Sequence, residues 1–274
     1  MTGNSYSEKC TVLRQLMQTY AKGNVMVAFS GGVDSSLLLK MAVMYAEEQG
    51  KKVYAVTADT ELHALQDMQI AKQITEELGV VHIVLELQEL EQADIRNNPL
   101  DRCYRCKKYL FGKIKEKAEE LQALTVLEGT NADDMLVYRP GIRAVEELGI
   151  KSPLREAGFA KKEVRRLAKE YGISVADRPS APCLATRFPY GEFLDRQKLA
   201  RVGQGEQFLR SMGFYNVRLR VHGDIARIEV DDTDMNQLLE NRKDIINYLK
   251  ALEYQYITID LEGFRSGSMD IHTN

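Results

Sequence analysis

The sequence predicts an α/β fold, in which a parallel sheet carries helices on both faces and a small α+β domain follows. Two observations support this. Over the first two thirds of the chain, short apolar runs alternate with amphipathic segments, which is typical of βαβ units around a buried parallel sheet. Beyond about Glu192 the order changes to helix, two strands, helix and a last strand. We therefore expect two domains, 1–180 and 181–274.

The first domain opens with a helix, a strand and a second helix. Apolar residues recur every three or four positions in 11–22 and again in 35–49, which predicts helices there. Between them, 25–29 is wholly apolar and short, as expected of a buried strand. Gly50 ends the second helix.

The same two patterns continue to the domain boundary. Strands are short apolar runs, and helices repeat their apolar residues with helical spacing and several end at a glycine. In chain order the predicted elements are strand 52–58, helix 61–78, strand 81–87, helix 107–121, strand 124–128 and helix 161–171. Ligands of such sheets bind at the carboxyl ends of the strands.

The second domain has a hairpin at its centre. A helix at 195–212 ends at Gly213, and strands 217–221 and 226–230 are separated by His222-Gly223-Asp224, a plausible turn. An amphipathic helix at 235–252 and a strand at 254–259 complete it.

Composition limits the classes of function. The chain has 274 residues, a net charge of −3 and 28% charged residues, which argues against broad nucleic-acid binding. We see no secretory signal and no apolar run long enough to span a membrane, so we expect a cytoplasmic protein. The four cysteines are then expected to be thiols or metal ligands, with Cys10 a core residue of the first helix.

A glycine-rich loop joins the first strand to the second helix. Two adjacent glycines allow close backbone approach, and N–H groups at a helix N-terminus form an anion site. The loop lacks the lysine of a Walker-type loop, and its acid is suited to holding Mg²⁺ against a phosphate. The alternative is a simple capped turn. We predict phosphate contacts from Ser30, Gly31, Gly32, Val33, Asp34, Ser35 and Ser36.

Polar residues also follow two other strands. Gly129, Thr130 and Asp133 come after the strand at 124–128, and Asp59 follows the strand at 52–58. At the same sheet edge they are suited to a second nucleotide or Mg²⁺ contact. Helix capping or a plain turn is the alternative for each.

Three cysteines stand in basic or proline-framed segments. Cys103 and Cys106 have the CxxC spacing among Arg and Lys residues, which favour thiolate, and Cys183 lies in a Pro-rich loop with Arg187. Three interpretations remain open: a three-cysteine iron–sulfur site, a sulfur-donating Cys183 with a redox pair, or structural thiols or an incomplete zinc site. We count Arg187 among the candidate catalytic residues.

The strand at 217–221 places two arginines on one face. Arg218 and Arg220 alternate, and arginine suits bidentate phosphate binding; a solvated strand face is the alternative. Glu206 and Glu229 are weaker candidates for metal or substrate support, because surface acids are usually only solvated.

The motifs resemble a known family. SGGVDSS looks like the signature of the PP-loop ATP pyrophosphatases, and with GTNADD and PCLATRFPYG the chain resembles the LarE family of ATP-dependent sulfur transferases. The resemblance implies adenylation of the carboxylates of pyridinium-3,5-biscarboxylic acid mononucleotide and their conversion to thiocarboxylates. Arg218 and Arg220 would bind the substrate phosphate. In the type with three cysteines, Cys103, Cys106 and Cys183 would ligate a [4Fe–4S] cluster; in the other type the cysteine matching Cys183 gives up its sulfur.

The implied cofactors are ATP, Mg²⁺ and the [4Fe–4S] cluster. The resemblance also implies a homo-oligomer, and the nickel-insertion and carboxylase proteins of the same pathway as possible partners, with no membrane or nucleic-acid partner. Three other functions stay open: a tRNA-thiolating enzyme, an ATP-dependent amidating ligase, and a non-enzymatic assembly protein that binds ATP and a cluster.

Overall fold

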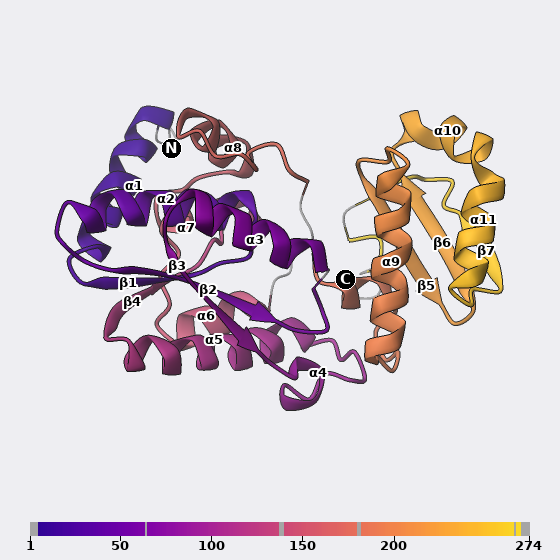
Figure 1. The fold of residues 1–274 in the computed structure, drawn as a ribbon, viewed down its shortest axis with the longest axis horizontal. Coiled ribbons are helices and arrows are strands. Elements are labelled where there is room, and N and C mark those ends of the chain that lie inside the picture. The colour runs from indigo at the N-terminus through magenta and orange to yellow at the C-terminus, as the bar shows by residue number, and fades with distance from the viewer. Residues whose placement is uncertain (1–4, 64, 137–139, 180–181, 266, 270–274) are drawn as a thin grey trace. The chain divides into compact units, whose positions relative to one another are not determined.

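The chain forms two compact units, shown in Figure 1 as a computed structural model that describes residues 5–63, 65–136, 140–179, 182–265 and 267–269. Unit 1 comprises Met1–Thr60, Leu65–Ala93 and Asp101–Ser180, and unit 2 comprises Glu61–Ala64, Asp94–Leu100 and Ala181–Asn274. Within the described part of the chain, no helix is both long enough and apolar enough to traverse a bilayer.

Unit 1 is built on a parallel sheet of four strands in the order β3-β2-β1-β4, with helices on both faces (Figure 1), which confirms the predicted fold class. Its strands are β1 (Asn24–Ala28), β2 (Val53–Asp59), β3 (Val81–Glu86) and β4 (Ala123–Leu127). Its helices are α1 (Tyr6–Tyr20), α2 (Val33–Glu47), α3 (Leu65–Glu77), α4 (Glu89–Gln92), α5 (Arg102–Glu120), η1 (Ala132–Leu136), α6 (Gly141–Glu147), α7 (Pro153–Glu156) and α8 (Lys161–Glu170).

The alternation of side chains along β1 divides the core of unit 1 in two. Val25 and Val27 are fully buried in the cluster formed with α1, α2, α3 and α8. Met26, between them, is buried in the opposite cluster with Phe111 and Ile114 of α5. Because all four strands run the same way, their carboxyl ends share one edge, and the loops after β1 and β4 meet there.

Several helix boundaries differ from those predicted. Helix α1 begins at Tyr6 instead of 11, because Ser5 and Glu8 form a reciprocal capping box. Helix α5 begins at Arg102 instead of 107, so both CxxC cysteines lie on a helix. Helix α3 begins at Leu65 instead of 61, and the Leu62 carbonyl accepts a hydrogen bond from the Leu184 N–H at 2.9 Å. Between β4 and α8, where the sequence analysis placed no helix or strand, the chain forms the short helices α6 and α7.

Unit 2 contains a three-stranded sheet in the order β5-β6-β7. The predicted hairpin is confirmed: β5 and β6 are antiparallel, and Gly223 in the turn has φ of +58°. The last strand, β7, pairs in parallel with β6. The helix predicted at 235–252 is instead two helices that meet at Asn241, whose side chain bonds the Gln237 carbonyl at 2.8 Å. The elements are η2 (Leu184–Arg187), α9 (Arg196–Ser211), β5 (Val217–His222), β6 (Ile225–Val230), η3 (Asp232–Asp234), α10 (Met235–Glu240), α11 (Arg242–Ala251) and β7 (Tyr256–Ile259).

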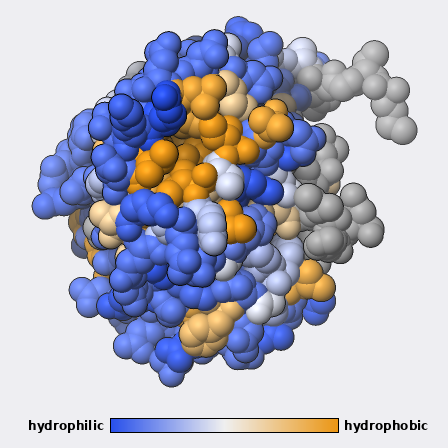
Figure 2. All heavy atoms as spheres, turned by 90° about the vertical axis from the view of Figure 1, so that its right-hand side faces the viewer, coloured by the Kyte–Doolittle hydropathy of each residue, from blue (hydrophilic) through white to orange (hydrophobic). Residues whose placement is uncertain are grey.

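Two short segments from the first half of the chain belong to unit 2. Asn98 is fully buried there, and its side-chain amide donates to the carbonyls of Phe188 and Pro189 at 3.2 and 2.7 Å. The Leu194 N–H donates to the Arg96 carbonyl at 2.6 Å. These bonds hold the segment that follows Cys183. Figure 2 shows apolar side chains gathered on one face of this unit, whose exposed large apolar residues include Ile225, Leu239, Ile246 and Leu261.

Candidate active site

The loop between β1 and α2 has the geometry of an anion site. Gly31 has φ of +66°, and a Cβ there would lie 3.1 Å from the Ala71 backbone nitrogen, so both its conformation and its surroundings require glycine. Gly32 is the N-cap of α2 and supplies no side-chain cap, which leaves N–H groups of the first turn for a ligand. Ser35 shapes the loop, because its hydroxyl donates to the Gly32 carbonyl at 3.1 Å and lies 3.2 Å from the Ser30 hydroxyl.

Two of the predicted motifs meet at Asp34, in the first turn of α2. One oxygen of its carboxylate accepts a hydrogen bond from the Asn131 amide at 3.2 Å, and the other forms an ion pair with Lys161. A Cβ at Gly129 would lie 3.0 Å from the Asp34 Cβ and 3.2 Å from the Ser35 nitrogen, so any larger residue would force the two loops apart by a few tenths of an ångström. The loops after β1 and β4 therefore form one polar site.

Two residues of this site were missed by the sequence analysis. Lys161, the first residue of α8, pairs with Asp34. Arg178 donates to the Gly31 carbonyl at 3.3 Å and to the Asp67 carboxylate at 2.5 Å. The absence of lysine from the loop was a signal for Lys161, because the negative charge of phosphates then needs a cation from elsewhere in the chain. No pattern around Arg178 indicated its contacts.

Three predicted nucleotide contacts have structural partners of their own. Both donors of Thr130 bind the buried Glu128, with the N–H at 3.0 Å and the hydroxyl at 2.7 Å. Asp133 caps α8 by accepting from the Lys161 N–H at 2.8 Å. Asp59 ends β2, and its carbonyl accepts from the Leu87 N–H at 3.0 Å. Their contacts with a nucleotide stay predictions.

Cys103 and Cys106 lie at the start of α5, one helical turn apart and therefore on the same side of the helix. Cys103 is exposed and Cys106 is half-buried. Arg102 donates to the Cys103 sulfur at 3.9 Å. Three other basic residues nearby have carboxylate partners: Arg105 pairs with Asp101 at 2.9 Å, Lys107 with Glu128 at 3.8 Å, and Lys108 with Glu147. Their positive charge is thus partly compensated, which the sequence analysis did not anticipate. Cys10 is buried in the core, as predicted.

Cys183 lies in unit 2, in a loop that Arg187 holds. The Arg187 side chain is 1% exposed and makes a bidentate ion pair with Glu206, at 2.7 and 2.9 Å. Its remaining nitrogen donates to the carbonyls of Pro182 and Cys183 and to the Thr186 hydroxyl, at 3.1, 3.3 and 2.7 Å. Arg187 thus fixes the backbone beside the Cys183 thiol. Ser180 and Ala181, at the start of the quoted Pro-rich loop, lie outside the described residues.

The two arginines of β5 are buried, at 4% exposure each, so the alternative of a solvated strand face is wrong. Arg220 pairs with Glu229 at 2.9 Å and donates to the Thr186 carbonyl at 3.0 Å. Arg218 stacks its guanidinium over the Phe264 ring, 5.0 Å from the centroid. Glu206 and Glu229 are also buried and bind arginines, so neither is a surface acid.

Burial and neighbouring charges together set the pKa values in this cluster. Burial, together with the positive charge of Arg187, lowers the pKa of Arg218 to about 10. Burial alone would raise the pKa of Glu206, but the charge and hydrogen bonds of Arg187, with Arg210 and Arg218, hold that pKa at about 2. Neighbouring positive charges disfavour the charged form of an arginine, and a nearby anion favours it. Binding of a substrate phosphate by Arg218 and Arg220 stays a prediction.

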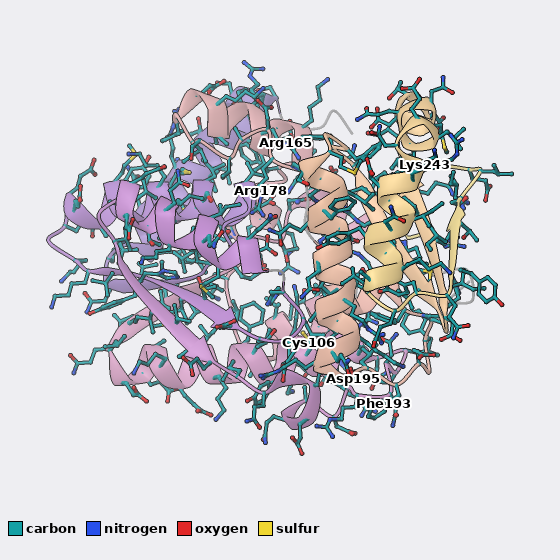
Figure 3. All side chains as sticks on the ribbon, turned by 45° about the vertical axis from the view of Figure 1, so that its right-hand side comes forward. Cys106, Arg165, Arg178, Phe193, Asp195 and Lys243 are labelled. Carbon is teal, nitrogen blue, oxygen red and sulfur yellow. The ribbon has the colours of Figure 1, made fainter. Side chains whose placement is uncertain are left out.

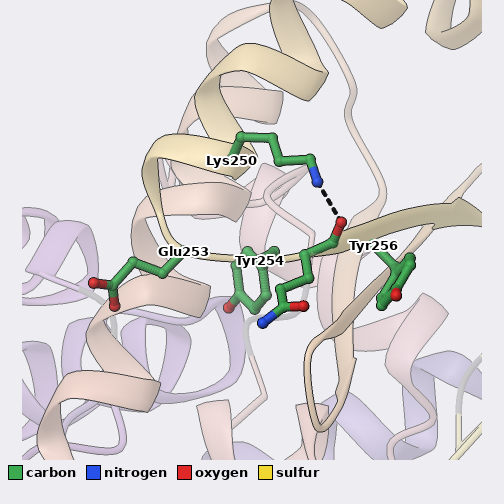
Figure 4. Close-up of a pocket in the computed structure, with 5 residues that line it drawn as sticks. Lys250, Glu253, Tyr254 and Tyr256 are labelled. Carbon is green, nitrogen blue, oxygen red and sulfur yellow. Dashed lines mark hydrogen bonds between the residues drawn. The ribbon is translucent and has the colours of Figure 1, made fainter.

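Other features of the described residues carry no predicted chemistry. A surface pocket of 490 Å³ lies between α11 and β7, and the Lys250 ammonium donates there to the Gln255 carbonyl (Figure 4). None of the predicted site residues lines it. Within the described ranges, no three His, Cys, Asp or Glu side chains are grouped to hold a metal ion; the CxxC pair and Cys183 belong to different units, each described by itself.

Comparison with known proteins reaches both units. A sequence profile of the PP-loop domain matches residues 6–137. Pyridinium-3,5-bisthiocarboxylic acid mononucleotide synthase of Lactiplantibacillus plantarum is 39% identical over 246 residues, which cover 90% of this chain and 88% of that protein. An uncharacterised protein of Synechocystis is 34% identical over 94% of this chain and 96% of its own length. A tRNA-specific 2-thiouridylase of Rickettsia felis is 27% identical and covers 58% of this chain and 53% of its own.

Proposed function

Because this chain belongs to the PP-loop family of ATP pyrophosphatases, we propose that it is an ATP-dependent sulfur transferase that converts the carboxylates of pyridinium-3,5-biscarboxylic acid mononucleotide to thiocarboxylates. One observation carries the substrate assignment: the similarity to the Lactiplantibacillus synthase extends over 90% of the chain and includes unit 2 as well as the nucleotide loop. The joining of the loops after β1 and β4 at Asp34 supports the adenylation chemistry.

In the first half-reaction a carboxylate oxygen of the substrate attacks the α-phosphorus of ATP. The bond from that phosphorus to the bridging oxygen breaks, and pyrophosphate leaves. N–H groups of the loop from Ser30 to Ser36 are placed to bind the phosphates, and Asp34 is the residue suited to hold Mg²⁺. Lys161 then exchanges its ion pair with Asp34 for the phosphates, which stabilises the leaving group.

The arginine cluster of unit 2 supports binding of the substrate phosphate. Arg220 is held by the buried Glu229 and Arg218 lies over the Phe264 ring, so their guanidinium groups are preorganised. A phosphate beside Arg218 would offset the burial and the positive charge of Arg187 that lower the pKa of Arg218. The Arg187 guanidinium already donates hydrogen bonds to Glu206 and to the Cys183 carbonyl, and we assign it the role of holding the Cys183 loop.

In the second half-reaction sulfur attacks the adenylated carbonyl carbon, and AMP leaves. We propose that the sulfur is delivered at Cys103, Cys106 and Cys183. The donor set fits a cluster, since thiolates are its ligands and Cys103 and Cys106 share one side of α5. When bound by three thiolates, a [4Fe–4S] cluster has one iron without a protein ligand, which is suited to carry the extra sulfur. The alternative is direct donation of the Cys183 sulfur.

A tRNA-thiolating function is the second candidate, favoured by the similarity to the Rickettsia 2-thiouridylase. That similarity covers 58% of this chain, against 90% for the synthase. The net charge of −3 also disfavours a large RNA-binding face.

We further propose that the protein assembles as a homo-oligomer and works with nickel-insertion and carboxylase proteins of the same pathway. The apolar surface of unit 2 in Figure 2 supports self-association, since patches of this kind are commonly covered by another chain.

The test combines anaerobic purification, analysis of iron and acid-labile sulfide, and mass spectrometry of the pyridinium substrate after incubation with MgATP. We expect pyrophosphate release that depends on the pyridinium mononucleotide and a product in which sulfur replaces oxygen. Substrate-independent pyrophosphate release, or thiolation of tRNA only, would overturn the proposal.

Cysteine variants separate the two sulfur sources. Under the cluster proposal, Cys103→Ser, Cys106→Ser and Cys183→Ser each abolish iron binding and thiocarboxylate formation, whereas the buried Cys10→Ala leaves both intact. If only Cys183→Ser loses activity, and wild-type Cys183 loses the mass of its sulfur during turnover, direct donation is the mechanism.

A further inference from the structure

The peptide between Gly31 and Gly32 has a fixed orientation set by one side chain. The Gly31 carbonyl accepts a hydrogen bond from Arg178 at 3.3 Å. In a planar trans peptide the C=O and the following N–H point in opposite directions. The contact with Arg178 therefore directs the Gly32 N–H away from Arg178 and toward the other side of the loop.

This orientation needs support because both flanking residues are glycines. Gly31 has φ of +66° and Gly32 has φ of −83° and ψ of 163°, and glycine adopts the conformations on either side of a peptide flip at little cost. A flipped peptide would present a carbonyl oxygen where the loop otherwise offers an N–H. One misdirected carbonyl repels an anion that the N–H would bind.

Arg178 is itself held by two other residues, Asp67 and Arg165; Figure 3 labels Arg178 and Arg165. Its second nitrogen pairs with Asp67 in the first turn of α3, at 2.5 Å, with both side chains largely buried at 20% and 16% exposure. Arg165 of α8 donates to the carbonyls of Ala176 and Arg178, each at 2.8 Å. Arg165 of α8 thus holds the backbone of Arg178, while Asp67 of α3 holds its guanidinium, with one donor directed at the loop.

We propose that Arg178 is a positioning residue that locks the Gly31–Gly32 peptide with its N–H toward the phosphates of ATP. The inference rests on the proposed function, in that it takes the loop to bind ATP. Arg178 does not touch the nucleotide; it acts through the carbonyl of Gly31. Its removal should therefore weaken the binding of phosphates and leave the binding of the nucleoside unchanged.

The test compares dissociation constants for MgATP and for adenosine, measured by calorimetry, in the wild type and in Arg178→Ala. We expect the dissociation constant for MgATP to rise about 10-fold in the variant, which is the effect of losing about one hydrogen bond to a charged group. The dissociation constant for adenosine should stay within about twofold of the wild-type value. Arg178→Lys keeps one donor and should recover most of the ATP affinity. Arg166→Ala is the matched control, since Arg166 is exposed on α8 and pairs with Glu170.

The outcomes separate the two proposals. If the wild type does not bind MgATP, the proposed function fails. If Arg178→Ala binds MgATP as tightly as the wild type, the function stands and the locking role is wrong. Equal weakening of MgATP and adenosine would mean that Arg178 supports the fold in general, which also overturns the inference.

Discussion

The buried ion pair between Arg187 and Glu206 should contribute a large, pH-dependent part of the stability of unit 2. Both side chains are 1% exposed and joined by two hydrogen bonds. The pKa of Glu206 falls from 4.5 to about 2 in the folded state. A shift of that size corresponds to about 3 kcal/mol of folding free energy at neutral pH, the lower end of the cost of breaking a buried pair. Glu206→Gln should therefore destabilise unit 2 by about 3 kcal/mol.

The sign of the pH dependence follows from the direction of the shift. Because the folded-state pKa is depressed, the stabilisation is complete above the unfolded pKa of 4.5 and is lost as pH falls toward 2. At pH 3.5 about 1.4 kcal/mol of it should be gone, so the difference between wild type and variant should narrow by that amount.

The assay is urea unfolding followed by hydrogen exchange and mass spectrometry of peptides from α9 and β5, which report on unit 2 alone. Glu253→Gln is the matched control: Glu253 pairs with Arg201 at 3.0 Å but is 69% exposed, and such pairs contribute at most about 1 kcal/mol. Equal destabilisation by the two variants, or a gap that stays constant down to pH 3.5, would refute the reasoning.

Three further predictions concern unit 1. Lys161→Ala should slow substrate-dependent pyrophosphate release by about 10- to 100-fold, because it removes one charged hydrogen bond to the phosphates. Lys162→Ala, at the exposed neighbouring position, should leave the rate unchanged. Equal rates for the two variants would contradict a role for Lys161 at the phosphates. Gly129→Ala should weaken MgATP binding, because its Cβ would lie 3.0 Å from the Cβ of Asp34 and displace that residue. Gly112→Ala on α5, with nothing within 4 Å, should bind MgATP normally. Calorimetry measures both, and normal binding by Gly129→Ala would show that the two loops can separate without loss. Asp34→Asn should raise the Mg²⁺ concentration that gives half-maximal pyrophosphate release by about 10-fold. Asp177→Asn, at an exposed position, should leave that concentration unchanged. If Asp34→Asn also leaves it unchanged, the metal binds elsewhere.

Much of unit 1 could be predicted from the sequence because its signals are local. Apolar runs and helical periodicity define a parallel sheet, and parallel strands bring their following loops to one edge. From the sequence alone, that reasoning predicts that Asp34 and Gly129 lie at the same edge of the sheet. Helix starts were less accurate, since the capping box at Ser5 and Glu8 and the Arg105–Asp101 pair lie in stretches with few apolar residues.

The parts that could not be predicted depend on tertiary contacts. Lys161 and Arg178 are ordinary basic residues in sequence, and only the fold brings them to Asp34 and Gly31. The alternation of Arg218 and Arg220 along β5 left a phosphate site and a solvated face both open, and the partners that bury them, Glu229 of β6 and the Phe264 ring, could not be read from it. The alternation of side chains along a strand shows which residues share a face of the sheet, but it does not show which other elements cover that face.

Segments 61–64 and 94–100 belong to unit 2 although they precede most of it in the chain, and this has a consequence for folding during synthesis. On the ribosome these segments emerge long before the stretch around Phe188 to Leu194 that supplies their hydrogen-bond partners. Unit 1 can assemble its strands as they appear, whereas unit 2 must wait until β5, β6 and β7 have emerged, with Asn98 meanwhile exposed to water. A ribosome that stalls before β5 would therefore release a chain with a formed nucleotide loop and an open second unit, a species that chaperones and proteases can distinguish from the finished protein.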